Sequence, residues 1–192
     1  MPRLFIIAGC NGSGKTTASY ALLPGMLECS EFVNSDEFAK SLSPFHPESA
    51  YVAASRYMLM KMRFLLQRKA DFCIETTLAT RSLLKVIKDA KDAGYYVTIL
   101  YFWLNSPDLA VARVAARVAA GGHNIKEETI RRRYNVGLHY LFRDFMPICD
   151  RWLLLDNSNV PFSIVAEASE DGKIIREPEK FSKIQAINEE YE

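Results

Sequence analysis

Gly9-Cys10-Asn11-Gly12-Ser13-Gly14-Lys15-Thr16-Thr17 follows the pattern G-x-x-x-x-G-K-T, which is typical of a phosphate-binding loop. The apolar run Leu4–Ala8 before it has the composition of a buried parallel strand. The residues after it, Thr16–Leu23, favour a helix that ends before Pro24. In such a strand–loop–helix unit, backbone N–H groups and the positive end of the helix converge, so we expect nucleotide phosphates to bind there. A glycine-rich turn without a ligand is the alternative, and the flanking strand and helix argue against it.

The loop also predicts how a nucleoside triphosphate is held. Lys15 would reach the β- and γ-phosphates, and the hydroxyl of Thr16 would hold Mg²⁺. The residues of the loop that we expect to bind the nucleotide are Gly9, Asn11, Gly12, Ser13, Gly14, Lys15, Thr16 and Thr17.

The composition is that of an ordinary globular protein. The chain has 192 residues, of which 49% are hydrophobic and 24% charged, so we expect a single domain over residues 1–192. The formal net charge of +1 gives no overall field that would attract nucleic acid or an anionic membrane. We therefore expect neither as a partner.

The four cysteines lie far apart without C-x-x-C spacing, which is typical of reduced cytosolic thiols. Positive potential in the loop would lower the pKa of Cys10, unless Cys10 is simply a small loop residue. The first strand starts close to the amino terminus and leaves no room for a signal peptide, and every apolar stretch is too short to span a bilayer. These features predict a cytoplasmic protein.

Strand-like and helix-like segments alternate along the chain, which predicts an α/β fold with a parallel sheet of about five strands and helices on both faces. The expected strands are 4–8, 31–34, 71–77, 95–104 and 151–155. The expected helices are 16–23, 48–68, 82–93, 106–118 and 125–145. Asp171-Gly172 predicts the turn of a β-hairpin between 162–168 and 173–176, and 178–192 is expected to form a short surface helix. The methionines of the helix 48–68 are expected in the core; they are Met58, Met60 and Met62.

Two acidic residues follow strands at the edge of the sheet where open α/β folds bind ligands. Asp36 comes after the second strand, where its carboxylate would face an acceptor hydroxyl across the γ-phosphate and act as a general base. The alternative is that Asp36 caps the helix that starts at Glu37. Glu75 ends the third strand, near the expected Mg²⁺ or its waters, and a buried glutamate paired with a neighbouring hydroxyl is the alternative there.

Arginines gather on two expected helices that Gly121-Gly122 joins. Arg113 and Arg117 are four residues apart and share one helix face, and Arg131-Arg132-Arg133 belongs to the next helix. We expect residues 113–134 to form a lid that closes over the phosphates, where arginine stabilises the charge of the transferred group. A solvated basic face or an RNA-binding patch is the alternative. Because three consecutive arginines cannot all face one site, at least one of them points elsewhere.

Five motifs in order resemble the zeta-toxin-like family of P-loop kinases, in particular its compact bacterial branch. They are GCNGSGKTT (9–17), FVNSDEFA (32–39), FCIETTL (72–78), RVAARVAAGGHNIKEETIRRRY (113–134) and LLLDNS (153–158). The resemblance extends from Phe5 to Ser158 and implies a P-loop NTPase fold like that of adenylate kinase, with ATP and Mg²⁺ as cofactors. The characterised toxins phosphorylate the 3′-hydroxyl of the sugar in UDP-N-acetylglucosamine. The resemblance also raises an antitoxin protein as a partner.

Matched position by position, the resemblance implies that Asp36 is the catalytic base, Lys15 the phosphate lysine and Arg117 the first lid arginine. Arg132 is the preferred candidate for the second lid arginine. Glu75 would reach Mg²⁺ through water. The residues implied beside the acceptor are Asp36, Glu75, Thr76 and Thr77. The residues implied beside the adenine are Asp156 and Asn157.

Two departures from the family pattern lie on the acceptor side. The toxins carry a glutamate on the helix before the third strand, where this chain has Met58-Leu59-Met60, and Thr76 replaces a glycine. The resemblance therefore implies ATP-dependent phosphorylation of a small-molecule hydroxyl more firmly than it implies UDP-N-acetylglucosamine as the acceptor. Two other functions stay open: a switch that hydrolyses ATP slowly and acts through a partner, and a polynucleotide 5′-kinase that uses the arginines 131–133.

Overall fold

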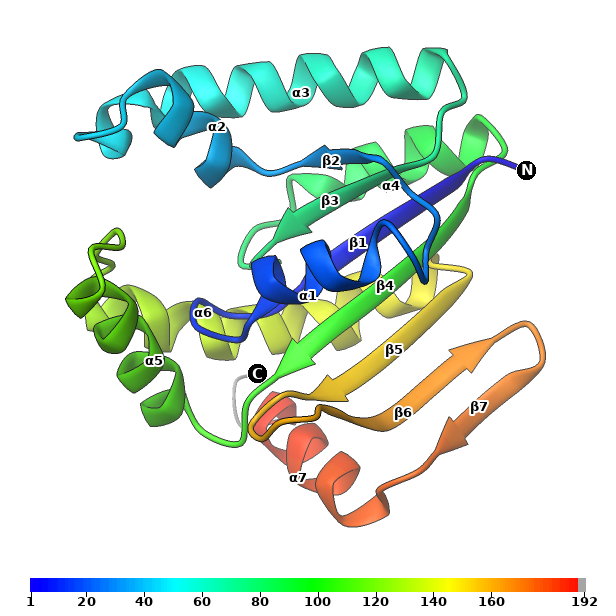
Figure 1. The fold of residues 1–192 in the computed structure, drawn as a ribbon. Coiled ribbons are helices and arrows are strands. Elements are labelled where there is room, and N and C mark those ends of the chain that lie inside the picture. The colour runs from blue at the N-terminus through cyan, green and yellow to red at the C-terminus, as the bar shows by residue number, and fades with distance from the viewer. Residues whose placement is uncertain (190–192) are drawn as a thin grey trace.

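Seven strands form one sheet in the order β2-β3-β1-β4-β5-β6-β7 (Figure 1). In this computed structural model, which describes residues 1–189, β2, β3, β1, β4 and β5 are parallel and β6 and β7 continue the sheet as an antiparallel hairpin. The strands are β1 (Arg3–Ala8), β2 (Glu31–Val33), β3 (Phe72–Thr76), β4 (Tyr96–Trp103), β5 (Arg151–Asp156), β6 (Ser163–Ser169) and β7 (Gly172–Ile175). The expected parallel sheet and hairpin are confirmed, and the hairpin extends the sheet because β6 pairs with β5.

Seven α-helices within residues 1–189 connect or follow these strands. They are α1 (Lys15–Leu22), α2 (Ser35–Leu42), α3 (Tyr51–Gln67), α4 (Leu83–Asp92), α5 (Pro107–Ala119), α6 (Glu127–Tyr140) and α7 (Pro178–Glu189). A 3₁₀ turn, η1 (Pro47–Ala50), leads into α3, while a π-helical turn, η2 (Leu141–Phe145), and a 3₁₀ turn, η3 (Met146–Ile148), follow α6. Residues 190–192 of the expected terminal helix lie outside the described residues.

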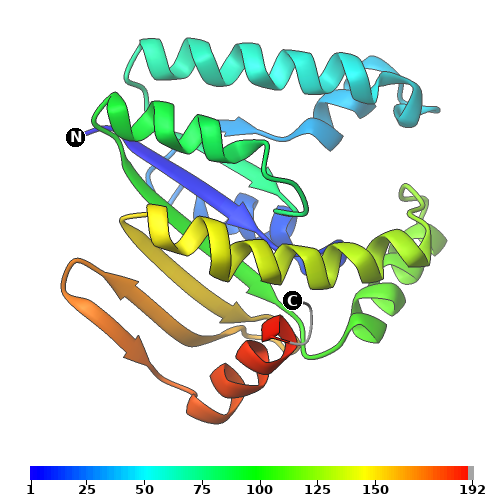
Figure 2. The same ribbon diagram turned by 180° about the vertical axis from the view of Figure 1, so that it is seen from behind.

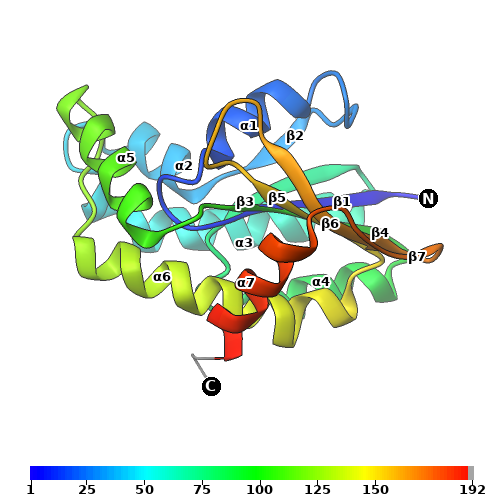
Figure 3. The same cartoon turned by 90° about the horizontal axis from the view of Figure 1, so that it is seen from below.

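The sheet is covered on both faces, but unequally (Figure 3). α1 packs on one face, where Leu22 and Leu23 join a smaller cluster of buried strand residues. The opposite face carries the larger core, to which α3, α4, α6 and α7 all contribute buried side chains. Figure 2 shows α4 and α6 lying across this face. Parallel strands buried on both faces explain the near-continuous apolar runs in the sequence.

Local signals set where the helices begin and end. Ser106 precedes α5 and its Oγ accepts a hydrogen bond from the Leu109 N–H at 3.2 Å, with Pro107 in the first turn. Gly121 follows α5 with a φ of +85°, a conformation that glycine adopts without strain. Both signals were read correctly from the sequence.

Two helix predictions need correction. The predicted helix 125–145 is regular only over α6, because the chain widens into η2 from Leu141 before β5. The predicted surface helix at the carboxyl end is docked on the core, since Phe181 and Ile184 of α7 are buried. No helix within residues 1–189 combines the length and apolarity needed to cross a bilayer.

Candidate active site

A cleft with a volume of about 900 Å³ opens at the carboxyl ends of β1 and β3. The loop between β1 and α1 forms its floor, and Figure 1 shows α2 and α3 on one side of this loop and α5 with the start of α6 on the other. The sequence positions that line the cleft include the predicted residues Asn11, Lys15, Thr16, Asp36, Glu75, Thr76, Thr77 and Arg117. The fold therefore brings most of the predicted site together.

The loop has the tight backbone that phosphate binding needs. Gly12 and Gly14 have φ values of +80° and +86°, and Gly14 is the residue before α1. A Cβ at Gly12 would lie 2.6 Å from the Ala110 carbonyl oxygen, and one at Gly14 would lie 2.4 Å from Asn157 Nδ2. Side chains are thus excluded here, and backbone N–H groups at the start of α1 are free to face an anion.

Lys15 is buried inside this loop. Its Nζ donates a hydrogen bond to the Cys10 carbonyl oxygen at 2.8 Å, and burial lowers the pKa of its ammonium while the Glu75 carboxylate opposes that shift. Burial also raises the pKa of the Cys10 thiol to about 11, and Lys15 offsets this only in part. The suggestion that the loop lowers the pKa of Cys10 is therefore wrong, because loss of hydration outweighs the positive potential.

Glu75 connects the start of α1 with the residue that follows β2. Its Oε1 accepts a hydrogen bond from Thr16 Oγ1 at 2.9 Å, and its Oε2 accepts one from Asn34 Nδ2 at 2.9 Å. Burial raises the pKa of Glu75, and Lys15 and the Thr16 hydroxyl counteract part of the shift. The alternative of a buried glutamate paired with a neighbouring hydroxyl is thus what the structure shows, and a Mg²⁺ ion on the Thr16 hydroxyl would lie beside this carboxylate.

Asn34 is a site residue that the sequence reasoning missed. Its Oδ1 accepts hydrogen bonds from the backbone N–H groups of Asp36 and Glu37, at 2.8 and 3.2 Å, and so caps α2. The alternative in which Asp36 is the cap is therefore wrong. Asp36 does not cap the helix, and it lines the cleft from the first turn of α2.

The threonines after Glu75 also line the cleft. The Thr76 hydroxyl accepts a hydrogen bond from the Leu78 N–H at 3.1 Å, which fixes the chain as it leaves β3. Leu78 itself has a φ of +53° and is buried, so the turn after the two threonines is held in one conformation.

Arg133, rather than Arg132, faces the loop. Arg133 Nη1 donates a hydrogen bond to Asn11 Oδ1 at 3.0 Å, and burial lowers the pKa of its guanidinium against the pull of Asp36. Arg132 is exposed and lies outside the lining of the cleft, and Arg131 pairs with Asp108 at 2.6 Å on the surface. The preference for Arg132 is thus a one-residue error in helix phase.

The two arginines of α5 have different surroundings, although both line the cleft. Arg113 donates to the carbonyl oxygens of Asn157 and Ser158, each at 2.9 Å, and so fixes the turn after β5. Arg117 donates to the carbonyl oxygen of His123 at 3.0 Å. Arg117 is therefore attached to the loop between α5 and α6.

A hydrogen bond crosses the mouth of the cleft. The Tyr51 hydroxyl at the start of α3 lies 2.8 Å from His123 Nε2 in the α5–α6 loop, and their rings meet edge to face. Since Arg117 donates to the carbonyl oxygen of the same histidine, His123 connects α5 with α3. No sequence signal pointed to this contact, because its partners are 72 residues apart.

Asp156 does not lie in the cleft. Its carboxylate is buried, and its Oδ2 lies 2.8 Å from Lys180 Nζ of α7. Burial tends to raise its pKa, but hydrogen bonds from Lys180 and Ser158 outweigh it and the pKa is lowered. The Asp156 side chain is therefore engaged with α7 outside the cleft, and the position of this segment beside the adenine stays a prediction. Asn157 Nδ2 donates to the Ser13 carbonyl oxygen at 2.8 Å and supports the loop from outside.

The residues present fit ATP and Mg²⁺. The side-chain-free cradle at Gly12 and Gly14 suits a phosphate chain, and Lys15 lies within it. The Thr16 hydroxyl and the Glu75 carboxylate, already in contact, are the hard oxygen donors that Mg²⁺ prefers. No group of three or more His, Cys, Asp or Glu side chains in the described part of the chain forms a metal site, so the ion would depend on these two residues and on phosphate.

Comparisons with known proteins agree with this geometry. A family described as an AAA domain matches residues 4–134. An uncharacterized protein of Haemophilus influenzae is 32% identical over 126 residues, which are 66% of this chain and 88% of that protein. The family match covers the loop between β1 and α1, includes α2, α3 and α5, and ends at residue 134 within α6.

Solved structures share the fold at low sequence identity. A chain of the PezAT chromosomal toxin–antitoxin system of Streptococcus pneumoniae has a TM-score of 0.67 and 16% identity, over 100% of this chain and 87% of that chain. AvrRxo1-ORF1:AvrRxo1-ORF2 has TM-scores of 0.77 with sulphate and 0.69 with ATP, at 16% identity over 96% of this chain and 63% of that chain. Since identities this low establish the fold alone, the resemblance to zeta-toxin-like P-loop kinases is confirmed at that level.

Proposed function

The chain belongs to the AAA domain family of P-loop proteins, and on this basis we propose that it is an ATP-dependent kinase that phosphorylates a hydroxyl group of a small molecule. The observation that carries the proposal is the position of Asp36. Its carboxylate is not used to cap α2 and lines the same cleft as Lys15 and Arg133. A protein that only binds or slowly hydrolyses ATP has no need of a base on that side of the phosphates.

The donor half of the site is formed by the loop and β3. Lys15 and the N–H groups at the start of α1 would hold the phosphates, while Thr16 and Glu75 would hold Mg²⁺. ATP with Mg²⁺ supplies an activated phosphoryl group whose charge the ion partly neutralises. The nucleotide-binding role of Gly9, Asn11, Ser13 and Thr17 belongs to the same proposal.

Asp36 would accept the proton of the acceptor hydroxyl as the hydroxyl oxygen bonds to the γ-phosphorus, while the bond from that phosphorus to the bridging β-phosphate oxygen breaks and ADP leaves. General-base assistance of this kind is worth roughly 10²–10⁴-fold in rate. Arg133 and Arg117 would stabilise the negative charge of the transferred group from the lid side, and the Tyr51–His123 contact would keep the lid closed over it. Glu75, Thr76 and Thr77 border the space left for the acceptor.

A sugar nucleotide such as UDP-N-acetylglucosamine is one acceptor of this class. A protein partner is also part of the proposal, because the fold is shared with a chain of a toxin–antitoxin system and with AvrRxo1-ORF1, which was solved together with AvrRxo1-ORF2. We place the reaction in the cytoplasm, where ATP is available.

The test replaces the base and leaves the ATP side intact. Asp36→Asn should abolish transfer of the γ-phosphate to an acceptor while ATP affinity stays within about twofold of the wild type. Asp89→Asn on α4 is the matched control, since it makes the same chemical change in a surface pair with Lys85. Transfer by the Asp36→Asn variant at the wild-type rate would reject Asp36 as the base.

A further inference from the structure

The cations of the cleft are concentrated on its donor side. Lys15 belongs to the loop, and Arg113, Arg117 and Arg133 belong to the two lid helices. Among the described residues that line the cleft, Lys40 is the one cation outside the loop and the lid. Any second anionic group bound in the cleft would therefore have to rely on Lys40 or compete with the phosphates of ATP.

Lys40 is already paired. Its Nζ lies 2.8 Å from Glu37 Oε1, one turn earlier on α2, and the neighbouring Asp36 carboxylate also lines the cleft. The acceptor side of α2 thus presents two carboxylates and one ammonium that is engaged with one of them. A phosphate group placed against α2 would meet net negative charge, which raises the cost of binding it.

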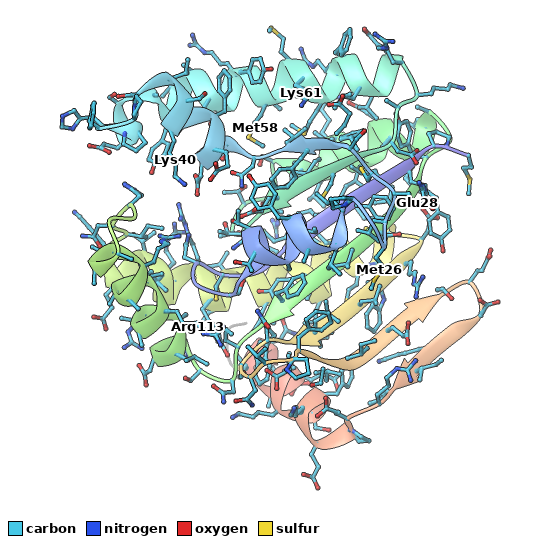
Figure 4. All side chains as sticks on the ribbon, viewed as in Figure 1. Met26, Glu28, Lys40, Met58, Lys61 and Arg113 are labelled. Carbon is cyan, nitrogen blue, oxygen red and sulfur yellow. The ribbon has the colours of Figure 1, made fainter. Side chains whose placement is uncertain are left out.

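An apolar wall faces these charges. Met58, Leu59 and Met62 of α3 line the cleft together with Ile74 of β3 and Leu83 of α4. Figure 4 shows Met58 extending from α3 toward the sheet. Met62, Ile74 and Leu83 are buried, so the wall is backed by the main core and keeps its shape. The prediction that all three methionines belong to the core is wrong for Met60, which is 66% exposed. Met58 packs against the main core and also lines the cleft, as buried Met62 does.

Neutral hydroxyl groups border the apolar wall. Ser55 lies on α3, Thr76 and Thr77 follow the Glu75 position of β3, and Thr80 and Ser82 lie in the loop before α4. The hydroxyls of Thr80 and Ser82 are 2.9 Å apart and orient each other. Such groups recognise hydroxyl, carbonyl and amide groups of a ligand without adding charge.

We propose that the acceptor is a hydroxyl compound with an apolar face and without phosphate or another anionic group, the chemistry that nucleosides have. The proposal rests on the kinase function proposed above and selects within it. The apolar body of the acceptor lies against α3, its hydroxyl reaches Asp36, and the lid cations serve the transferred phosphoryl group alone. Within the class of acceptors proposed above, sugar nucleotides are disfavoured, because among the described residues that line the cleft their diphosphate would meet no unpaired cation outside the loop and the lid.

The first test separates acceptors by charge. The full-length protein is incubated with Mg²⁺ and ATP labelled at the γ-phosphate, together with a deproteinised metabolite extract that an anion exchanger has split into retained and unretained fractions. Label should appear as a phosphate ester in the unretained fraction, and mass spectrometry then identifies the compound. Ester formed in the retained fraction, or from added UDP-N-acetylglucosamine, would overturn this inference and leave the kinase function intact. Label released only as inorganic phosphate with both fractions would instead reject the kinase function.

The second test adds a cation to the apolar wall. Leu59 is 44% exposed and lines the cleft, whereas its neighbour Met60 is 66% exposed and lies outside the lining. Leu59→Lys should lower kcat/KM for the unretained acceptor at least about tenfold, because a charged group replaces apolar contact, while ATP affinity is unchanged. Met60→Lys makes the same charge change on the same helix and should have no effect. Unchanged or faster transfer by Leu59→Lys would contradict the inference.

Discussion

Replacing Arg133 with alanine should slow phosphoryl transfer by on the order of 10³-fold or more, which corresponds to about 4 kcal/mol at the transition state. The structure supports an effect of this size because the guanidinium is half-buried and bonds Asn11 of the phosphate loop at 3.0 Å, where solvent screens its charge poorly. The same change removes one charge-assisted hydrogen bond, so the fold should lose only about 1–2 kcal/mol of stability.

Arg132→Ala is the matched control, since it removes the same charge from the adjacent residue of α6, whose side chain is exposed. The assay compares kcat for transfer and ATP affinity in the two variants and the wild type, with a thermal unfolding scan of each protein. Arg132→Ala should remain within about twofold of the wild type. The reasoning would be refuted if Arg132→Ala lost more activity than Arg133→Ala, or if Arg133→Ala stayed as active as the wild type.

Three further predictions follow from contacts around the cleft. Because burial raises the pKa of Glu75 above its unfolded value, the folded state binds that proton more tightly, and the free energy of unfolding should fall as pH rises from the ordinary glutamate range toward the raised pKa. Glu75→Gln should make the free energy of unfolding, measured in urea, less dependent on pH over this range. The same pH dependence in the variant and the wild type would contradict the prediction. Tyr51→Phe removes the 2.8 Å bond to His123 and should raise the KM for ATP by roughly 3- to 10-fold, whereas an unchanged KM would show that the contact does not hold the lid. Lys180→Met leaves buried Asp156 without its cation and should cost about 1–2 kcal/mol of stability with no change in ATP affinity. Weaker ATP binding at full stability would instead support a nucleotide-binding role for Asp156.

The sequence was most informative where chemistry and local structure coincide. The loop around Lys15 needs particular residues at fixed spacing, so it was recognised directly. The end of β2 before Asp36 and the end of β3 at Glu75 and Thr76 followed from the alternation of strands and helices. These elements are confirmed as parts of one cleft. Their chemical roles stay predictions.

The sequence did not predict contacts that depend on the register between two strands or on the phase of a helix. β2 pairs with β3 so that Val33 lies beside Ile74, and only this register brings Asn34 to Glu75. The phase of α6 depends on its start at Glu127, and a shift of one residue turns a helix by 100°.

Two further differences between sequence and structure have other causes. The pairing of Asp156 with Lys180 requires α7 to dock on the core, which no local signal indicated. The error at Met60 was avoidable, because residues two apart on a helix face nearly opposite sides, so Met60 could not share the inward face of Met58 and Met62.

The fate of the γ-phosphate tests the central claim most directly. Wild-type protein is incubated with Mg²⁺, γ-labelled ATP and the metabolite extract, and the label is separated into phosphate ester and inorganic phosphate. We expect most of the label to enter a phosphate ester. No ester should form when Lys15 is replaced by alanine, since Lys15 would hold the phosphates of ATP. Label found only as inorganic phosphate, with or without the extract, would contradict a kinase and favour a slow ATPase.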